Sequence, residues 1–180
     1  LPRSAQNALY QVMMSQSPVD TDGFSLDGHK MVCRPIETNT AKMDLCLELA
    51  REQEQYVLDC RRWLHAHPEL SCQEYETTKF IIAELEKMGI PVQTYEDCTG
   101  CTAIIEGGKP GKTVMLRADI DALPIQEPAD KPNCSQNPGI MHACGHDGHT
   151  AMLLGAAKIL MEHRTELEGN VKRIFQMGEE

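Results

Sequence analysis

Two stretches in the first half of the chain place apolar residues at helical spacing. The first covers residues 41–64 and should end before Pro68, because proline cannot continue a helix. The second follows a Ser-x-x-Glu capping box at Ser71 and Glu74, and Gly89 stands where a C-terminal cap belongs. Its apolar face would contain Thr78, Ile81, Ile82, Leu85 and Met88. We therefore expect two amphipathic helices joined by a turn.

Strand-like runs and one further helix follow. Strands are predicted at 90–95, 102–106, 113–117 and 171–176. The glycine-rich segment 107–111 predicts a hairpin loop between the second and third of them. A helix is expected at 150–163, where Gly155, Ala156 and Ala157 would allow close packing on the sheet. Strand 113–117, this helix and strand 171–176 would form one parallel crossover unit, so the fold class is α/β, a mixed β-sheet flanked by helices.

The segments outside this pattern differ in character. Residues 118–148 lack periodicity and are rich in Asp, Pro, Gly and His, and a loop of that length inside a domain is usually functional. Residues 1–42 hold four acidic and four basic side chains with weak periodicity. We expect 1–42 to be a poorly ordered extension and 43–180 to form the domain.

Composition excludes some classes of partner. The net charge of −10 lies in residues 43–180 and disfavours nucleic acid or an anionic membrane. There is no apolar run near 18 residues, and no secretory signal is visible. The eight cysteines are scattered without a disulfide framework, which favours a reducing, cytoplasmic location. Cys98 and Cys101 form a C-x-x-C that invites a redox interpretation, although the segment also fits a turn between strands.

A thiol and three imidazoles gather in residues 141–150, just ahead of the helix. Cys144 and His146 are separated by one residue, so in an extended loop both side chains point to the same side and can reach one metal ion. Sulfur and imidazole donors suit a transition metal, and the N-terminal end of the following helix should favour the thiolate of Cys144. His142 and His149 would support the ligands or face the substrate.

Carboxylates follow two strand ends. Glu179 and Glu180 come directly after the last strand, where Gly178 would let the chain leave the sheet, so that one Glu can bind metal while the other takes a proton from metal-bound water. Asp119 and Asp121 follow strand 113–117 and could orient an imidazole ligand, or simply end the strand. His65 and His67 lie at a helix end, where a structural role is preferred.

Four ordered motifs, at 61–71, 116–127, 141–150 and 175–180, give the chain a family resemblance. They read Arg-Arg-x-Leu-His-x-His-Pro-Glu-Leu-Ser, Leu-Arg-Ala-Asp-Ile-Asp-Ala-Leu-Pro-Ile-Gln-Glu, Met-His-Ala-Cys-Gly-His-Asp-Gly-His-Thr and Phe-Gln-x-x-Glu-Glu. The chain from about residue 43 onward resembles the metal-dependent amidohydrolases related to aminoacylase, hippurate hydrolase and indole-acetyl-amino-acid hydrolase. The resemblance implies the N-terminal part of a zinc-exopeptidase-like catalytic domain.

The resemblance also implies a chemistry. It implies hydrolysis of the amide bond of N-acyl amino acids at a site with two divalent transition-metal ions, manganese or zinc, with cobalt or nickel as alternatives. Cys144, His146 and Glu180 would be metal ligands, Glu179 the general base, and Asp119 and Asp121 supporting residues.

The chain departs from the family in two respects. Met177 and Gly178 stand where the family usually has Pro-Ala. Family members also continue past this point with further histidine ligands and a domain that forms homo-oligomers, so the 180 residues alone are expected to bind metal weakly and to be inactive. The alternatives are a non-catalytic metal-binding or interaction module on the same scaffold and, well behind it, a cysteine-based redox protein.

Overall fold

The computed structural model describes residues 48–180 together with 25–26 and 29–30. The chain divides into two compact units, 1–47 and 48–180. In the first, the short strands β1 (Ser25–Leu26) and β2 (His29–Lys30) pair antiparallel. The expectation for residues 1–42 otherwise lies outside the described residues. All of the candidate site residues belong to the second unit.

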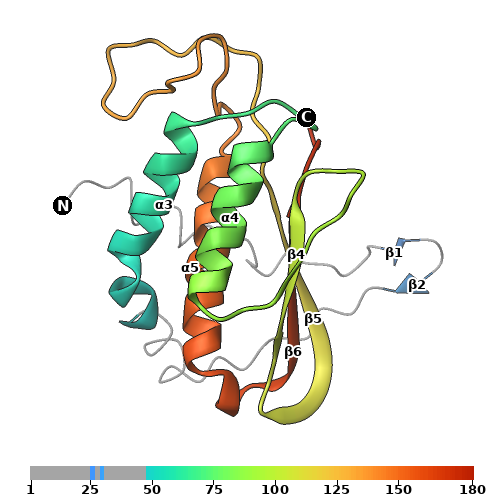
Figure 1. Cartoon of the computed structure of the whole chain (residues 1–180). Helices are drawn as coiled ribbons and strands as arrows, with labels where there is room; N and C mark the ends of the chain where they lie inside the picture. The colour runs from blue at the N-terminus through green and yellow to red at the C-terminus, as the bar shows by residue number, and fades with distance from the viewer. Residues whose placement is uncertain (1–24, 27–28, 31–47) are drawn as a thin grey trace. The chain divides into compact units, whose positions relative to one another are not determined.

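Three helices form one layer beside the sheet (Figure 1). They are α3 (Glu54–Ala66), α4 (Tyr75–Lys87) and α5 (His146–Glu162), and residues 48–52 are helical as well. Helix α3 ends two residues before Pro68, as predicted. Gly89 follows α4 with φ +72°, a conformation that suits a glycine after a helix end. The periodicity of the sequence therefore predicted both helices and their ends, while the start predicted for the first, at residue 41, lies outside the described residues.

The capping box predicted at Ser71 and Glu74 is wrong. Helix α4 begins at Tyr75 and has no side-chain hydrogen bond at its N-cap. The Ser71 hydroxyl lies 2.7 Å from Oδ2 of Asp121, and Oε1 of Glu74 accepts hydrogen bonds from the backbone N–H groups of Cys72 and Gly178. Both side chains are occupied by tertiary contacts, so neither caps the helix.

The sheet has the order β3–β4–β6–β5. Its strands are β3 (Val92–Gln93), β4 (Cys101–Glu106), β5 (Lys109–Asp119) and β6 (Glu168–Gln176). Strands β5 and β6 are parallel neighbours connected through α5, so the predicted crossover unit is confirmed. Strand β4 pairs antiparallel with β6, which makes the sheet mixed.

The hairpin predicted at 107–111 is wrong, because β6 lies between β4 and β5. The connection instead wraps around the start of β6: Gly107 N–H donates to the carbonyl oxygen of Gly169. A Cβ added to Gly107 would lie 2.1 Å from that oxygen, and one added to Gly111 would lie 2.6 Å from the Gly169 nitrogen. The glycines of this segment therefore serve close backbone contact with a third strand.

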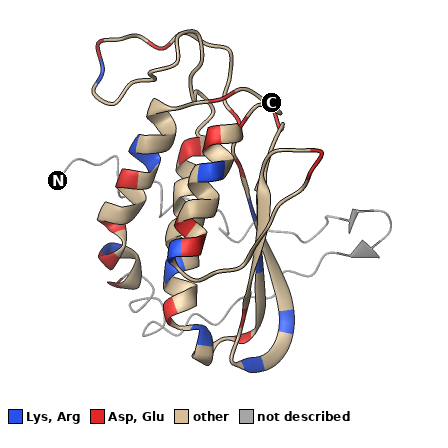
Figure 2. Cartoon of the chain, viewed as in Figure 1, with Lys and Arg blue, Asp and Glu red and all other residues tan. Residues whose placement is uncertain are grey.

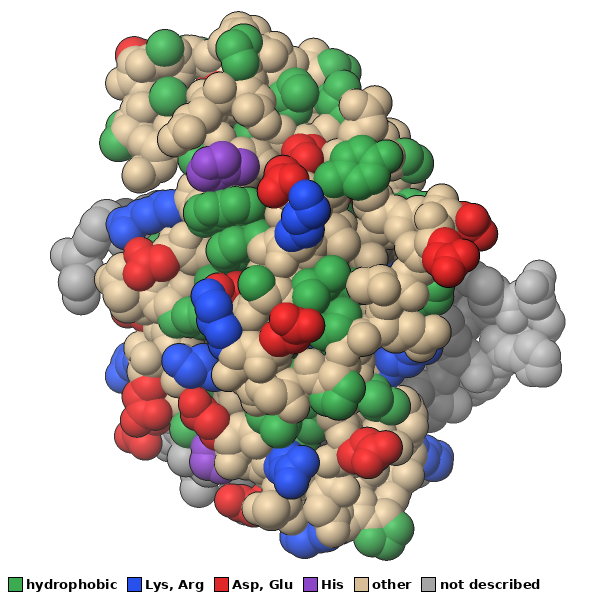
Figure 3. All heavy atoms as spheres, viewed as in Figure 1, with side chains coloured by type: hydrophobic (Ala, Val, Ile, Leu, Met, Phe, Trp, Pro, Cys, Tyr) green, Lys and Arg blue, Asp and Glu red, His purple; other side chains and the backbone are tan. Residues whose placement is uncertain are grey.

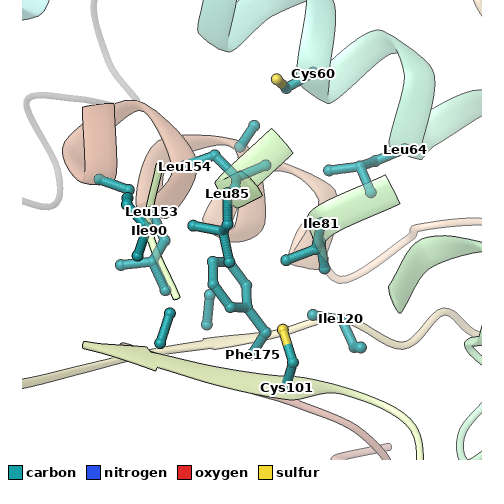
Figure 4. Close-up of a cluster of buried hydrophobic side chains, with 14 of the residues drawn as sticks. Cys60, Leu64, Ile81, Leu85, Ile90, Cys101, Ile120, Leu153, Leu154 and Phe175 are labelled. Carbon is teal, nitrogen blue, oxygen red and sulfur yellow. The ribbon is translucent and has the colours of Figure 1, made fainter. Parts of the chain in front are cut away.

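The hydrophobic core fills the space between the sheet and the helices (Figure 4). Phe175 from β6 points toward the helix layer, where Leu85, Ile81 and Leu154 are fully buried. Gly155 does allow close packing, but a Cβ there would lie 2.5 Å from Val57 of α3, so it serves a helix–helix contact and not the sheet. No helix among the described residues is long and apolar enough to cross a membrane.

Arg173 is an exception within this core. It lies two residues from Phe175 on β6 and therefore on the same, helix-facing side of the sheet. Its side chain is fully buried, and none of its guanidinium nitrogens has a hydrogen-bond partner among residues 48–180. Burial lowers the pKa of Arg173 to about 10, so the guanidinium is still protonated at neutral pH. A buried and unpaired charge of this kind destabilises a fold.

We predict that Arg173→Leu raises the free energy of unfolding by about 1–4 kcal/mol, the range of stabilisation seen when buried ion pairs are replaced by apolar residues. Thermal unfolding followed by circular dichroism measures the change. The control is Lys172→Leu, which alters the opposite face of the same strand and should leave the midpoint close to that of the parent. A midpoint for Arg173→Leu at or below the parent's would show that the guanidinium is satisfied in solution.

Candidate metal centre

Two candidate ligands at the start of α5 meet a third that follows β6. Ligand atoms of Cys144, His146 and Glu180 all lie within 4.8 Å of one another. Cys144 ends the loop before α5, His146 is the first residue of α5, and Glu180 follows β6. Because β5 and β6 are parallel, the segments that follow them leave the same edge of the sheet, where Figure 2 shows acidic residues close to the C-terminal end of the chain.

The ring of His146 is oriented by Asp121. Nδ1 of His146 lies 3.0 Å from both Oδ1 and the backbone carbonyl oxygen of Asp121. Both of these oxygens are acceptors, so Nδ1 carries the ring proton, and Nε2 presents its lone pair away from Asp121. His146 is 3 % exposed, which holds the ring in this orientation.

Asp121 also fixes the segment that follows β6. Its Oδ2 accepts hydrogen bonds from the backbone N–H of Glu180 at 2.8 Å and from the Ser71 hydroxyl at 2.7 Å. Burial alone would raise the pKa of Asp121, but the hydrogen bonds from Glu180 and Ser71 outweigh it and lower the pKa below its usual value. One ionised carboxylate therefore connects His146, Glu180 and the turn before α4.

The other three residues proposed from sequence for a supporting or substrate-facing role make no hydrogen bond to the candidate ligands among the described residues. Asp119 accepts a hydrogen bond from Arg117 on its own strand at 2.7 Å. His149 is exposed, with its ring centroid 5.9 Å from that of His146. His142 is 5 % exposed, and neither of its ring nitrogens has a partner among the described residues. Burial lowers the pKa of His142 to about 4, so this ring is neutral at pH 7.

Glu179 lies beside the three candidate ligands. Its Oε2 is 3.7 Å from Nε2 of His146, and its side chain is 44 % exposed. Adjacent residues of a regular strand would face opposite ways, but β6 ends at Gln176 and Gly178 adopts φ +63°. The predicted departure of the chain at Gly178 is therefore present, and it brings both glutamates to one site.

Glu74 fixes the segment that leads to the glutamate pair, a role that sequence reasoning missed. It is fully buried, and its Oε1 accepts a hydrogen bond from the backbone N–H of Gly178 at 3.0 Å, while its Oε2 accepts one from the Thr99 hydroxyl. It thus holds the departing end of β6 against α4. The only sequence signal was an acidic residue three positions after Ser71, which local rules assign to a capping box.

The thiol of Cys144 does not behave as its position before a helix suggested. The pKa of Cys144 is raised, and its hydrogen bond to Glu180 is the largest cause. Burial and the negative charges of Glu180 and Glu179 raise this pKa further. The neighbouring carboxylates therefore act against the thiolate that the helix N-terminus was expected to favour.

A second polar network adjoins the candidate metal centre. Nδ1 of His65 lies 2.8 Å from Oδ2 of Asp147, and its Nε2 lies 3.2 Å from Oε1 of Glu127. His65 thus has structural contacts, as expected, but they are with side chains distant in the sequence and not with the end of its own helix. His67 fits the original expectation more closely, because its Nδ1 lies 2.7 Å from the carbonyl oxygen of Trp63 in the last turn of α3.

The C-x-x-C segment gains no support as a redox site. Cys98 is exposed, whereas Cys101 is buried as the first residue of β4, and both are free thiols. Burial raises the pKa of Cys101 to about 12, which makes it a poor nucleophile at neutral pH.

These features define an α/β domain with a transition-metal donor set beyond the carboxyl ends of parallel strands. Residues 115–180 match the family described as Peptidase family M20/M25/M40. The chain is 48 % identical over 132 residues to the N-acyl-L-amino acid amidohydrolase of Geobacillus stearothermophilus, covering 73 % of this chain and 36 % of that one. It is 50 % identical over 136 residues to IAA-amino acid hydrolase ILR1-like 2 of Arabidopsis thaliana, covering 74 % and 31 %.

A solved structure agrees. The YXEP protein of Bacillus subtilis, described as a dinuclear metal binding peptidase from the M20 family, superposes with a TM-score of 0.65 at 45 % identity, covering 73 % of this chain and 36 % of that one. The resemblance to metal-dependent amidohydrolases is thus confirmed, and the fold corresponds to part of an M20 peptidase catalytic domain. The chain spans about a third of the length of the curated relatives it matches.

The position of the glutamate pair depends on Gly178, which gives a prediction. An alanine there is strained by the left-handed φ, at about 1–2 kcal/mol, and its Cβ would lie 2.9 Å from Sγ of Cys72. We therefore expect Gly178→Ala to lower the unfolding midpoint in a thermal melt. The double variant Gly178→Ala/Cys72→Ala should recover the part of this decrease that comes from the close contact with Cys72.

The matched control is Gly148→Ala in the first turn of α5, where an added Cβ meets nothing within 4 Å and φ is not positive. It should be neutral or stabilising by about 0.4–1 kcal/mol. Equal midpoints for Gly178→Ala and the parent would contradict the role given to Gly178.

Proposed function

We propose that residues 43–180 carry part of the active site of a metal-dependent amidohydrolase that cleaves the amide bond of N-acyl amino acids. The convergence of Cys144, His146 and Glu180 within 4.8 Å carries this proposal. In it, these three residues bind a divalent transition metal, manganese or zinc, with cobalt or nickel as alternatives. A second ion is proposed because a similar M20 structure is described as dinuclear.

The donor chemistry fits such an ion. The set combines a thiol, an imidazole whose Nε2 lone pair is free, and a carboxylate, which suits transition metals better than magnesium or calcium. None of the Lys or Arg ion pairs within residues 48–180 reaches Glu179 or Glu180. A cation would therefore offset the negative charge that gathers when the ligands ionise.

Glu179 is proposed as the general base. A bound metal of this kind lowers the pKa of a coordinated water from about 15.7 toward 7. Glu179 lies close enough to His146 to face the same site, and its partial exposure leaves the carboxylate open to solvent and substrate. It would take the proton from the attacking water and later donate it to the leaving amine. Asp121 would keep His146 in the tautomer that presents Nε2.

The substrate class follows from the relatives. The names N-acyl-L-amino acid amidohydrolase and IAA-amino acid hydrolase support an N-acyl amino acid as the small-molecule substrate. The acidic net charge, and the alternation of acidic and basic side chains on the face in Figure 3, support neither nucleic acid nor membrane as a partner. We further propose a reducing, cytoplasmic location, supported by free cysteines, and homo-oligomers formed through sequence beyond these residues.

The 180-residue chain should bind cobalt with the charge-transfer absorption of a metal–thiolate bond, because Cys144 would supply the sulfur. Binding should be weak, since only three candidate ligands cluster among the described residues. Titration with cobalt chloride, followed by absorbance, measures it. Cys144→Ala should abolish the absorption, and His146→Ala and Glu180→Ala should weaken binding by at least tenfold.

The matched control is Cys98→Ala, which removes another exposed cysteine and should leave the titration unchanged. Absorption that persists in Cys144→Ala, or that disappears in Cys98→Ala, would refute the assigned ligand set.

Turnover gives a separate prediction. The 180-residue chain should not hydrolyse N-acetyl or N-benzoyl amino acids, whereas a polypeptide that continues past residue 180 should do so in a chelator-sensitive way. In the longer polypeptide, Glu179→Gln should lower kcat by about 10²–10⁴ because the base is lost, with metal content unchanged. Glu180→Gln should lower the metal content as well. Full metal content without turnover in the unsubstituted longer polypeptide would favour the alternative, a non-catalytic metal-binding module.

A further inference from the structure

His65 of α3 lies between two buried carboxylates. Its Nδ1 is 2.8 Å from Oδ2 of Asp147, and its Nε2 is 3.2 Å from Oε1 of Glu127. The side chains of Asp147 and Glu127 are only 1 % and 4 % exposed. A neutral imidazole has one N–H, so donating to both carboxylates requires both ring nitrogens to be protonated. The hydrogen bond to Asp147 accordingly raises the pKa of His65.

The two contacts lead to different parts of the molecule. Asp147 is the second residue of α5 and also accepts a hydrogen bond from Nε of Arg61 at 3.2 Å. Glu127 lies in the loop between β5 and α5 and accepts a hydrogen bond from the backbone N–H of Ser135 at 2.7 Å. One imidazolium therefore connects α3 to the start of α5 on one side and to the loop on the other.

The contact with Asp147 bears directly on the metal centre. Asp147 follows His146 in the first turn of α5, after Gly145 with φ +112°. His146 turns toward Asp121 and Glu179, while Asp147 turns toward His65. The start of the helix is therefore held from two sides, and the orientation of His146 depends on both.

We propose that His65 is a positioning residue for the metal centre, acting through its Nδ1 contact with Asp147, while its Nε2 contact with Glu127 only holds the loop. This inference rests on the proposed metal site. It differs from a general stabilising role because the two contacts should have unequal effects on metal affinity, although each stabilises the fold.

Two substitutions separate the contacts. The amide nitrogen of asparagine can occupy the place of Nδ1, and that of glutamine the place of Nε2. His65→Asn thus keeps the contact with Asp147 and loses that with Glu127, and His65→Gln does the reverse. The reciprocal changes are Glu127→Gln and Asp147→Asn, which keep the shape of each partner and remove its charge.

The test is cobalt titration of the full 180-residue chain, with the metal–thiolate absorption as readout and a thermal melt of each metal-free variant. Loss of an outer contact to a ligand typically costs 10–100-fold in metal affinity. We expect His65→Gln and Asp147→Asn to lose affinity in that range, at least tenfold more than His65→Asn and Glu127→Gln. The melting midpoints of His65→Gln and His65→Asn should fall by similar amounts.

The control is His67→Gln, which alters the histidine two positions away on the same segment and should leave cobalt affinity unchanged, because His67 contacts Trp63 and not the network. If affinity follows the midpoint in all four variants, His65 is only a stabilising residue and the inference fails. If His65→Gln does not fold, the comparison of Asp147→Asn with Glu127→Gln decides. Absence of cobalt binding in the parent would overturn the proposed function itself, a result distinct from equal binding by parent and variants.

Discussion

The ionised carboxylate of Asp121 is the contact on which the rest of the site depends. It is 1 % exposed, and a carboxylate so deeply buried must be satisfied by donors from the protein. Those donors are Nδ1 of His146, the backbone N–H of Glu180 and the Ser71 hydroxyl, which come from three separate segments. The need to satisfy one buried charge thus brings together the start of α5, the end of the chain and the turn before α4.

A second buried carboxylate does the same for the strand that carries the glutamates. Glu74 accepts hydrogen bonds from Gly178 and from Thr99, and so ties the end of β6 to the loop before β4. The left-handed conformation of Gly178 then directs Glu179 and Glu180 to the side of His146. The geometry of the glutamate pair is therefore set by a helix and a loop that carry none of the candidate ligands.

The two networks at the start of α5 differ in charge balance. Around Asp147, the cationic groups Arg61 and His65 face a buried carboxylate. Around Cys144, acidic groups dominate, and the neighbouring carboxylates raise the pKa of the thiol. The first network is balanced by cationic groups of the protein, whereas no Lys or Arg ion pair within residues 48–180 reaches Glu179 or Glu180 in the second. The two networks meet at consecutive residues, His146 and Asp147.

The sequence by itself determined the helices and the parallel crossover unit and indicated three candidate ligands that the structure brings together, because periodicity, glycine caps and donor chemistry are local properties. It could not determine that β6 separates β4 from β5, since strand order depends on the packing of the whole sheet. Nor could it assign the hydrogen-bond partners of Glu74, Ser71 and His65. These partners lie 50 to 104 positions away in the chain, in the contacts Ser71–Asp121, His65–Asp147 and Glu74–Gly178. Only the tertiary structure decides which buried polar group satisfies which, because that choice depends on proximity in space.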